Sequence, residues 1–157
     1  MLRYILVSAE DKELLGHVFD ILNGCGEQMF KVRGLEHWLP PYPVEAIGKD
    51  CVDKLVFLVF DTEKDKYVST FQMYKNENGS LYIRKVATHP DYHGHGIGKK
   101  NLAFMESFAR RMGMSAMELD VYDKSEQAVR FYLSNGFVVT GKKETRRFEV
   151  LLMRKEI

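Results

Sequence analysis

The stretch HPDYHGHGIGKK at residues 89–100 places glycines at alternate positions, Gly94, Gly96 and Gly98, ahead of two lysines. Glycine costs conformational entropy to order, so this density indicates that the chain needs bare backbone here. A strand pattern ends just before the stretch and a helical pattern follows it. Exposed N–H groups at such a junction, with the positive end of the helix dipole, favour a phosphate group. We therefore predict an anion-binding turn.

Spacing excludes two familiar phosphate-binding turns. A nucleoside-triphosphate loop needs a glycine five residues before Gly98 and a hydroxyl side chain after Lys99, but the chain has His93 and Lys100 at those positions. A dinucleotide fingerprint that starts at Gly94 needs its third glycine where the chain has Lys99. What remains is a strand, a proline, a basic position and then G-x-G-x-G at the start of a helix.

The elements around this turn alternate in type along the chain. Residues 24–50 contain WLPPYP (38–43) and are predicted to form broken or short helices with loops. The pattern indicates one mixed α/β domain over residues 1–157, with a mostly antiparallel twisted sheet flanked by helices. The predicted strands are 3–8, 54–61, 66–74, 81–88, 116–122, 137–143 and 148–154, and the predicted helices start near Leu14, Gly98 and Ser125 and end near Gly24, Gly113 and Gly136.

Composition limits the class of protein. The 157 residues are 45% apolar and 29% charged, which is ordinary for a soluble globular protein. A net charge of +1 gives no reason to expect nucleic acid or an acidic membrane as partner. Cys25 and Cys51 form no disulfide framework and no metal-type spacing, so we expect a cytoplasmic location. LVFLVF (55–60) is too short to span a bilayer.

Two motifs carry a resemblance to a known family. VATHPDYHGHGIGKKNLAFME (86–106) resembles the pyrophosphate loop of the GNAT superfamily of acetyl-CoA-dependent N-acetyltransferases. S-x-x-A-x-x-F-Y-x-x-x-G-F (125–137) is similar to the helix that carries this family's tyrosine. The resemblance extends over about residues 54–154. It implies a GNAT-like N-acetyltransferase that moves an acetyl group from acetyl-CoA to a primary amine by direct attack in a ternary complex.

The resemblance also implies which residues hold acetyl-CoA, with no metal required. The glycine turn would hold the pyrophosphate, and the end of the preceding strand would pair with the pantetheine arm. The chain departs from the family pattern at His93, where relatives usually have Arg or Gln, and at Ser125, where they often have Asn. The expected cofactor-binding residues are Val86, Ala87, Thr88, His93, Gly94, His95, Gly96, Ile97, Gly98, Lys99, Ser125 and Ala128.

Tyr132 is the predicted catalytic residue. Acetyl transfer expels a CoA thiolate, which needs a proton or a strong hydrogen bond. Full proton transfer from a phenol with a pKa of ~10 to a thiolate whose acid has a pKa of ~8.5 is uphill by about 2 kcal/mol. We therefore expect Tyr132 to stabilise the departing sulfur by hydrogen bonding.

The acceptor side is less well determined by the sequence. An amine needs a general base, and Glu118, Asp120, His37 and Tyr42 are candidates, none of which the sequence selects. The resemblance places substrate-selecting loops at 28–47, where Trp38 and Tyr42 would line an apolar slot. We expect a small-molecule or peptide amine as the substrate, and neither nucleic acid nor a membrane as a partner. Assembly of the chain into a homodimer is compatible with the sequence.

Two other functions stay in view. A catalytically silent CoA-binding or regulatory GNAT-like domain is the alternative that the unassigned base keeps open. A metal site made of His89, His93, His95 and Asp91 is the other, since imidazole clusters bind zinc. Alternate residues in a glycine turn converge poorly on one ion, so the phosphate interpretation is preferred.

Overall fold

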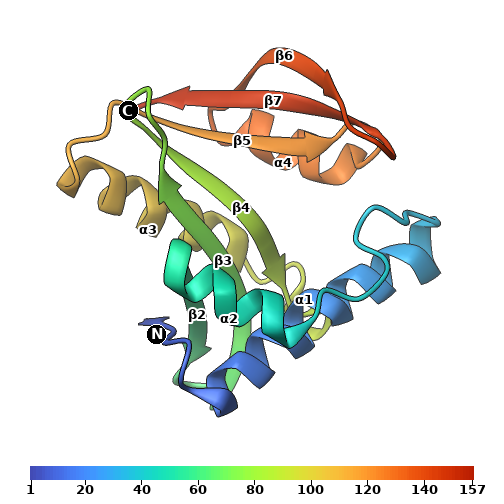
Figure 1. Ribbon diagram of the computed structural model, residues 1–157, viewed down its shortest axis with the longest axis vertical. Coiled ribbons are helices and arrows are strands. Elements are labelled where there is room, and N and C mark those ends of the chain that lie inside the picture. Colours follow the sequence, from blue (N-terminus) through green and yellow to red (C-terminus); the bar gives the residue numbers. More distant parts are fainter. The chain divides into compact units, whose positions relative to one another are not determined.

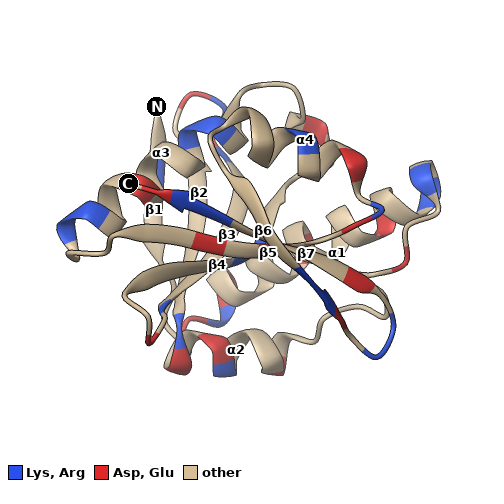
Figure 2. Ribbon diagram, turned by 90° about the horizontal axis from the view of Figure 1, so that it is seen from above, with Lys and Arg blue, Asp and Glu red and all other residues tan.

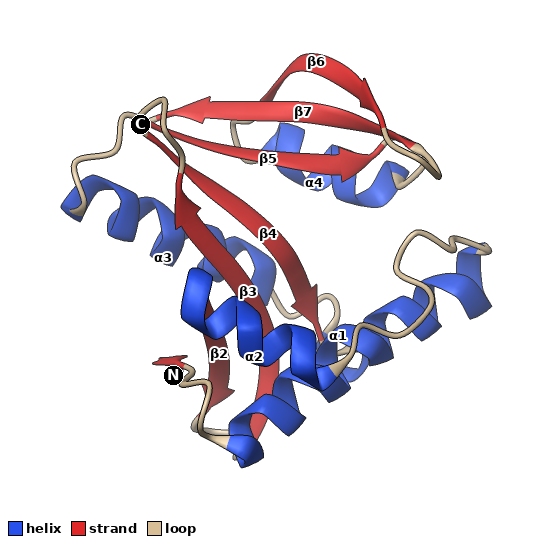
Figure 3. Cartoon of the chain, viewed as in Figure 1, coloured by secondary structure: helices blue, strands red, loops and turns tan.

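The computed structural model describes residues 1–157, which form seven strands and four α-helices in a mixed α/β arrangement (Figure 1, Figure 3). The predicted fold class is confirmed. In chain order the elements are β1 (Leu2–Leu6), α1 (Lys12–Arg33), α2 (Val44–Asp53), β2 (Leu55–Asp61), β3 (Lys66–Lys75), β4 (Ser80–Thr88), a 3-10 turn (Pro90–Tyr92), α3 (Ile97–Arg111), β5 (Ala116–Tyr122), α4 (Glu126–Ser134), β6 (Val138–Glu144) and β7 (Glu149–Glu156).

The strands belong to one sheet in the order β1-β2-β3-β4-β5-β7-β6. Strand β1 pairs with β2, β2 with β3, β5 with β7 and β6 with β7, all antiparallel. The parallel pair is β4 with β5, and its register covers only the first three residues of β4, Ser80 to Tyr82. The sheet is therefore mixed and mostly antiparallel. None of the four α-helices combines the length and the apolar composition that a membrane span requires.

The chain divides into two compact units, each built from two separate segments. The first unit contains residues 1–73 and 85–97, and the second contains residues 74–84 and 98–157. Strand β4 therefore begins in the second unit and ends in the first. One acetyltransferase domain over residues 1–157 stays a prediction.

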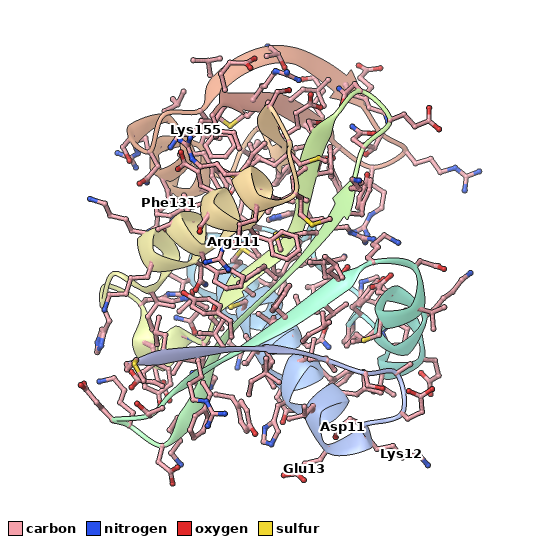
Figure 4. All side chains as sticks on the ribbon, turned by 90° about the vertical axis from the view of Figure 1, so that its left-hand side faces the viewer. Asp11, Lys12, Glu13, Arg111, Phe131 and Lys155 are labelled. Carbon is pink, nitrogen blue, oxygen red and sulfur yellow. The ribbon has the colours of Figure 1, made fainter.

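The core of the first unit lies between helices α1 and α2 and strand β2. Helix α1 begins at Asp11, whose carboxylate accepts the N–H of Leu14 at 3.1 Å (Figure 4). Apolar residues recur at helical spacing along α1, so one face of the helix is buried. The core residues are Val7, Leu15, Val18, Ile21, Leu22, Cys25, Ile47, Val56, Leu58 and Ala87.

Helix α1 runs past the end predicted at Gly24 and stops at Arg33, where Gly34 adopts a left-handed φ of 69°. The prediction that Gly24 ends this helix was wrong, since the helix continues through Gly24 and Gly26. Cys25 is buried in the core, which holds this turn of the helix. A Cβ atom on Gly26 would lie 3.2 Å from the Cβ atom of Trp38, so this glycine permits close packing of the following loop.

The second unit packs helices α3 and α4 with strands β5, β6 and β7. Glu106 of α3 forms ion pairs with Arg110 at 2.9 Å and with Lys155 of β7 at 3.2 Å. Charges of both signs are interspersed on the elements of each unit, as the small net charge suggests (Figure 2). The strand at 116–122 and both helices agree with the predicted positions within a few residues. The buried residues include Leu81, Ile83, Met105, Ala109, Met117, Leu119, Phe137 and Met153.

Gly24 and Gly26, both in the middle of α1, give a matched test of this packing. A Cβ atom on Gly24 meets nothing within 4 Å, whereas one on Gly26 would crowd the Cβ and the backbone oxygen of Trp38 at 3.2 and 3.3 Å. We expect Gly24→Ala to raise the free energy of unfolding by about 0.5–1 kcal/mol through helix propensity. We expect Gly26→Ala to lower it by about 1–3 kcal/mol through overpacking. Urea unfolding of both variants measures this, and equal stabilisation of the two would contradict the packing.

Candidate active site

The three glycines of the turn serve two different structural needs. Gly94 and Gly96 have φ values of 82° and 74°, a left-handed conformation that other residues rarely adopt. A Cβ atom on either would meet nothing within 4 Å, so the requirement is conformational rather than steric. Gly98 has no such φ, but a Cβ atom there would lie 3.0 Å from Cζ of Phe131.

The turn presents main-chain donors to solvent. The N–H groups of Gly94, His95 and Gly96 make no hydrogen bond to a backbone carbonyl, and all three residues are exposed. Ile97, the first residue of α3, is 4% exposed and anchors the turn in the core. Successive N–H groups in a turn with left-handed residues, next to the orphan donors of a helix start, form a concave anion site. The glycine turn lies where the sequence predicted it, and its role as an anion site stays a prediction.

The carbonyl oxygen of Thr88 ties the turn to the end of β4. It accepts hydrogen bonds from Sγ of Cys25 at 2.7 Å and from Nε2 of His93 at 2.8 Å. Because a carbonyl can only accept, Nε2 of His93 carries the hydrogen. Both lone pairs of this carbonyl are therefore engaged, and the imidazole of His93 links the turn to the end of β4.

The two thiols are poor nucleophiles in this environment. Burial raises the pKa of Cys25 to about 12, the hydrogen bond to Thr88 opposing only part of that rise. Burial, with the nearby carboxylates of Asp50 and Glu10, raises the pKa of Cys51 to about 11. A thiolate is the reactive form of cysteine, so neither residue suits a covalent acyl intermediate.

Helix α4 carries the second motif. Ser125 occupies the predicted N-cap position and is buried, but its side chain makes no capping hydrogen bond. The helix instead begins with the bond from the N–H of Val129 to the backbone oxygen of Ser125 at 3.0 Å. Ala128 lies partly buried in the first turn of α4. The hydroxyl of Ser125 is thus not used to cap the start of the helix.

Gly98 and Phe131 bring the two motifs into contact within the second unit. The 3.0 Å separation between a Cβ position on Gly98 and Cζ of Phe131 means that a larger residue at the start of α3 would press against this ring. Phe131 is seen beside α3 in Figure 4. Because Tyr132 follows Phe131, the contact fixes the part of α4 that carries the tyrosine relative to the start of α3.

Tyr132 is buried with its ring held on two sides. It is 8% exposed, and its ring meets Phe131 and Phe137 edge-on, with centroids 5.3 and 5.5 Å away. Its hydroxyl makes no hydrogen bond to another residue of the chain. Burial raises the pKa of this phenol well above its usual range, so the hydroxyl stays protonated and can donate at neutral pH.

Residues 17–137 match the sequence profile of the Acetyltransferase (GNAT) family. The chain belongs to this family. The match contains the glycine turn and the whole of the second motif, and acetyl transfer to an amine is the general reaction of GNAT enzymes.

Solved structures share the fold over the whole chain. The ribosomal-protein-S18-alanine N-acetyltransferase from Escherichia coli superposes with a TM-score of 0.78 at 16% identity, covering 100% of this chain and 94% of that one. The PaiA N-acetyltransferase from Thermoplasma acidophilum, in complex with coenzyme A, gives a TM-score of 0.74 at 19% identity and covers 100% and 99%.

A curated relative matches only a short segment. The tRNA(Met) cytidine acetyltransferase TmcA of Thermococcus sp. (strain AM4) is 40% identical over 57 residues, which are 36% of this chain and 7% of the relative. The chain thus spans a small fraction of the length of this relative.

The acidic candidates for the acceptor site already have partners within the GNAT chain. Glu118 is paired with Arg154 and accepts from Nδ2 of Asn78 at 2.9 Å. Asp120 accepts from the hydroxyl of Tyr82 at 2.5 Å. Neither carboxylate is selected as a general base by this geometry, and their roles stay predictions.

Trp38 and Tyr42 both pack against the core of the first unit. The structure adds residues that sequence reasoning missed. The hydroxyl of Tyr42 donates to Oδ2 of Asp50 at 2.7 Å, and Nε2 of Gln72 donates to the same oxygen at 3.0 Å. Asp50 and Gln72 lie on different elements and match no motif, so no local signal could have found them.

The histidines of the turn do not converge. His89 accepts through Nδ1 from the N–H of Asp91 at 3.1 Å, His93 bonds to Thr88, and His95 meets the ring of Tyr92 edge-on at 6.3 Å. No group of three or more His, Cys, Asp or Glu side chains is arranged to hold a metal ion.

The raised pKa of Cys25 leads to a reactivity test. At pH 8 this thiol stays protonated, because its pKa of about 12 must be approached before thiolate forms. We expect iodoacetamide to leave Cys25 unmodified in the native protein at pH 8 and to alkylate it in urea, where the pKa returns to ~8.5. Mass spectrometry of the peptides measures both states. Alkylation at equal rates with and without urea would show that the burial is absent.

Proposed function

We propose that this GNAT protein is an acetyl-CoA-dependent N-acetyltransferase acting on a primary amine. The observation that carries the proposal is the row of exposed, unpaired amides at Gly94, His95 and Gly96 beside the start of α3. These donors suit the diphosphate of CoA. Ile97, Gly98 and Lys99 extend the site into the helix.

The reaction we propose is a direct transfer. The amine nitrogen attacks the thioester carbon, a C–N bond forms, and the C–S bond breaks to release CoA thiolate. The ammonium loses one proton to solvent or a base before attack, and the attacking nitrogen loses a second proton to solvent or a base as the C–S bond breaks, which leaves a neutral amide. The N–H of Val86 is the proposed donor to the carbonyl oxygen as it gains negative charge. Val86 would pair with the pantetheine arm, since the carbonyls of Ala87 and Thr88 already accept side-chain hydrogen bonds. Ala87 and Thr88 would contact the arm at the same end of the strand. The high thiol pKa values support direct attack over an acyl-cysteine route.

Tyr132 is the proposed partner of the departing sulfur. Its phenol is neutral, is held by two rings and has a hydroxyl that no other residue engages. A raised pKa makes complete proton transfer less favourable still, so Tyr132 acts as a hydrogen-bond donor to the thiolate. Ser125 and Ala128, on the same helix, would contact the cofactor.

The acceptor is proposed to be a small-molecule or peptide amine. Three matched proteins are named as acetyltransferases of a ribosomal-protein alanine, of streptothricin and of a tRNA cytidine. Each of these acceptors bears an amino group. A catalytically silent CoA-binding domain is the competing function, favoured by the existing partners of Glu118 and Asp120. CoA release with any member of a broad amine panel separates the two.

The glycine turn can be tested with a matched pair of strained substitutions. Gly96 and Gly113 lie at opposite ends of α3 with φ values of 74° and 73°, and neither Cβ position is crowded. Alanine at either site should cost about 1–2 kcal/mol of stability. Acetyl-CoA at a hundred times its Kd should stabilise the wild type and Gly113→Ala by about 2.7 kcal/mol. We expect thermal-shift measurements to show that Gly96→Ala loses this gain, and retention of the full gain would contradict the site.

Substitution of Tyr132 tests the chemical step. We expect Tyr132→Phe to lower kcat by about a hundredfold, because the sulfur loses its hydrogen-bond donor, while the Kd of acetyl-CoA stays the same. Tyr4→Phe is the control, since that phenol is also half-buried with its pKa raised to about 12. The pKa of Tyr132 is raised, so its neutral form persists and the wild-type rate should show no loss from its ionisation up to pH 10. An unchanged kcat in Tyr132→Phe would remove the assignment.

A further inference from the structure

Lys85 is an outlier in the backbone of β4. Its φ of 52° is left-handed, and Asp65, at 55°, is the other non-glycine residue with a positive φ. Asp65 lies in the turn between β2 and β3, where Asp tolerates this conformation. A lysine inside a strand does not, so its surroundings must hold it there. The peptide plane that follows Lys85 carries the N–H of Val86, and its orientation is set by the backbone of Lys85.

The ring of Tyr42 holds the side chain of Lys85. Nζ of Lys85 lies 4.1 Å from the centroid of that ring, within the range of a cation–π contact. Lys85 and Tyr42 are distant in sequence, and both belong to the first unit. Figure 1 shows the loop that carries Tyr42 returning from the far end of α1 to the start of α2.

Tyr42 is itself fixed at three points. Oδ1 of Asn23 accepts its N–H at 2.7 Å, and Nδ2 of Asn23 donates to its carbonyl at 3.0 Å. Its hydroxyl donates to Asp50 at 2.7 Å. Hydrogen bonds therefore hold the loop that carries Tyr42 against α1 and hold the tyrosine ring against α2.

Asp50 makes the third point rigid. It is 6% exposed, and Oδ2 also accepts from Gln72 of β3, which is 1% exposed. Nζ of Lys54 lies 3.7 Å from Oδ1. A buried carboxylate with several partners holds its geometry well, because the loss of any one partner weakens the compensation of a buried charge.

We propose that Tyr42 is a positioning residue for acetyl transfer: by holding the ammonium of Lys85, it keeps the left-handed backbone that aims the Val86 N–H at the thioester carbonyl. Asn23 and Asp50 hold Tyr42 for this purpose. The inference rests on the proposed function, and it gives the Lys85 outlier a physical reason. Lys85 and Tyr42 act through Val86 and touch no reacting atom.

Isotope-edited infrared spectroscopy of acetyl-CoA labelled with carbon-13 at the thioester carbonyl tests the proposal without an acceptor amine. In the wild type we expect the carbonyl band to move to lower frequency on binding, because a hydrogen bond weakens the C=O bond. Lys85→Met removes the ammonium and keeps the chain length, and Tyr42→Leu removes the ring. Both should lose most of the band shift while the Kd of acetyl-CoA changes less than about threefold, because the diphosphate contacts remain.

Lys85→Gly supplies the rescue, since glycine adopts a positive φ without strain and needs no ring to hold it. It should restore at least half of the band shift that Lys85→Met loses. Tyr67→Leu, at another partly buried tyrosine of the first unit, is the control and should leave the band as in the wild type. In assays with any accepted amine, kcat should fall about tenfold in Lys85→Met with KM for acetyl-CoA unchanged.

The possible results are distinct. A wild-type band shift that survives in both Lys85→Met and Tyr42→Leu overturns the positioning role and leaves the proposed function intact. No band shift in a wild-type protein that binds acetyl-CoA overturns both the positioning role and the use of the Val86 N–H. Failure of acetyl-CoA to bind the wild type overturns the proposed function itself.

Discussion

The proposed diphosphate site depends on one constraint, the left-handed backbone at Gly94 and Gly96. It turns three consecutive main-chain donors outward instead of into secondary structure, at a point where the helix dipole of α3 adds positive potential. The turn does not hold itself. Ile97 anchors it in the core, and His93 bonds it to the carbonyl of Thr88 at the end of β4. These two contacts hold the turn that carries the three N–H groups.

A strained backbone residue and several side-chain contacts lie close together near the end of β4. Near the end of β4, Lys85 has a left-handed backbone, and the carbonyl of Thr88 accepts two side-chain hydrogen bonds. One of these bonds comes from the buried thiol of Cys25 on α1. Such conformations persist only where neighbouring elements fix them, and α1, α2 and the loop between them supply that support. Helix α1 contributes to this support directly, since Cys25 bonds to the end of β4 and Asn23 bonds to the loop that carries Tyr42.

The sequence predicted best where one local pattern decides the structure. Alternation placed β5 at 116–122, and glycine spacing placed the turn and the start of α3, because each signal lies within a few adjacent residues. It failed at Gly24, where the burial of Cys25 and the contact of Gly26 with Trp38 outweigh the helix-ending tendency of glycine. The Tyr42, Asp50 and Gln72 network was not predictable, because it joins three elements with no shared motif. The bond of His93 to Thr88 likewise depends on the tertiary path of the chain.

The most direct test of the central claim compares two acyl donors by amide NMR spectroscopy. Acetyl-CoA and acetyl-pantetheine share the thioester arm, but only acetyl-CoA carries the diphosphate. We expect large downfield shifts of the Gly94, His95 and Gly96 amide protons with acetyl-CoA and little change in them with acetyl-pantetheine. Amide signals that stay in place with acetyl-CoA, or that move equally with both donors, would contradict the proposed diphosphate site.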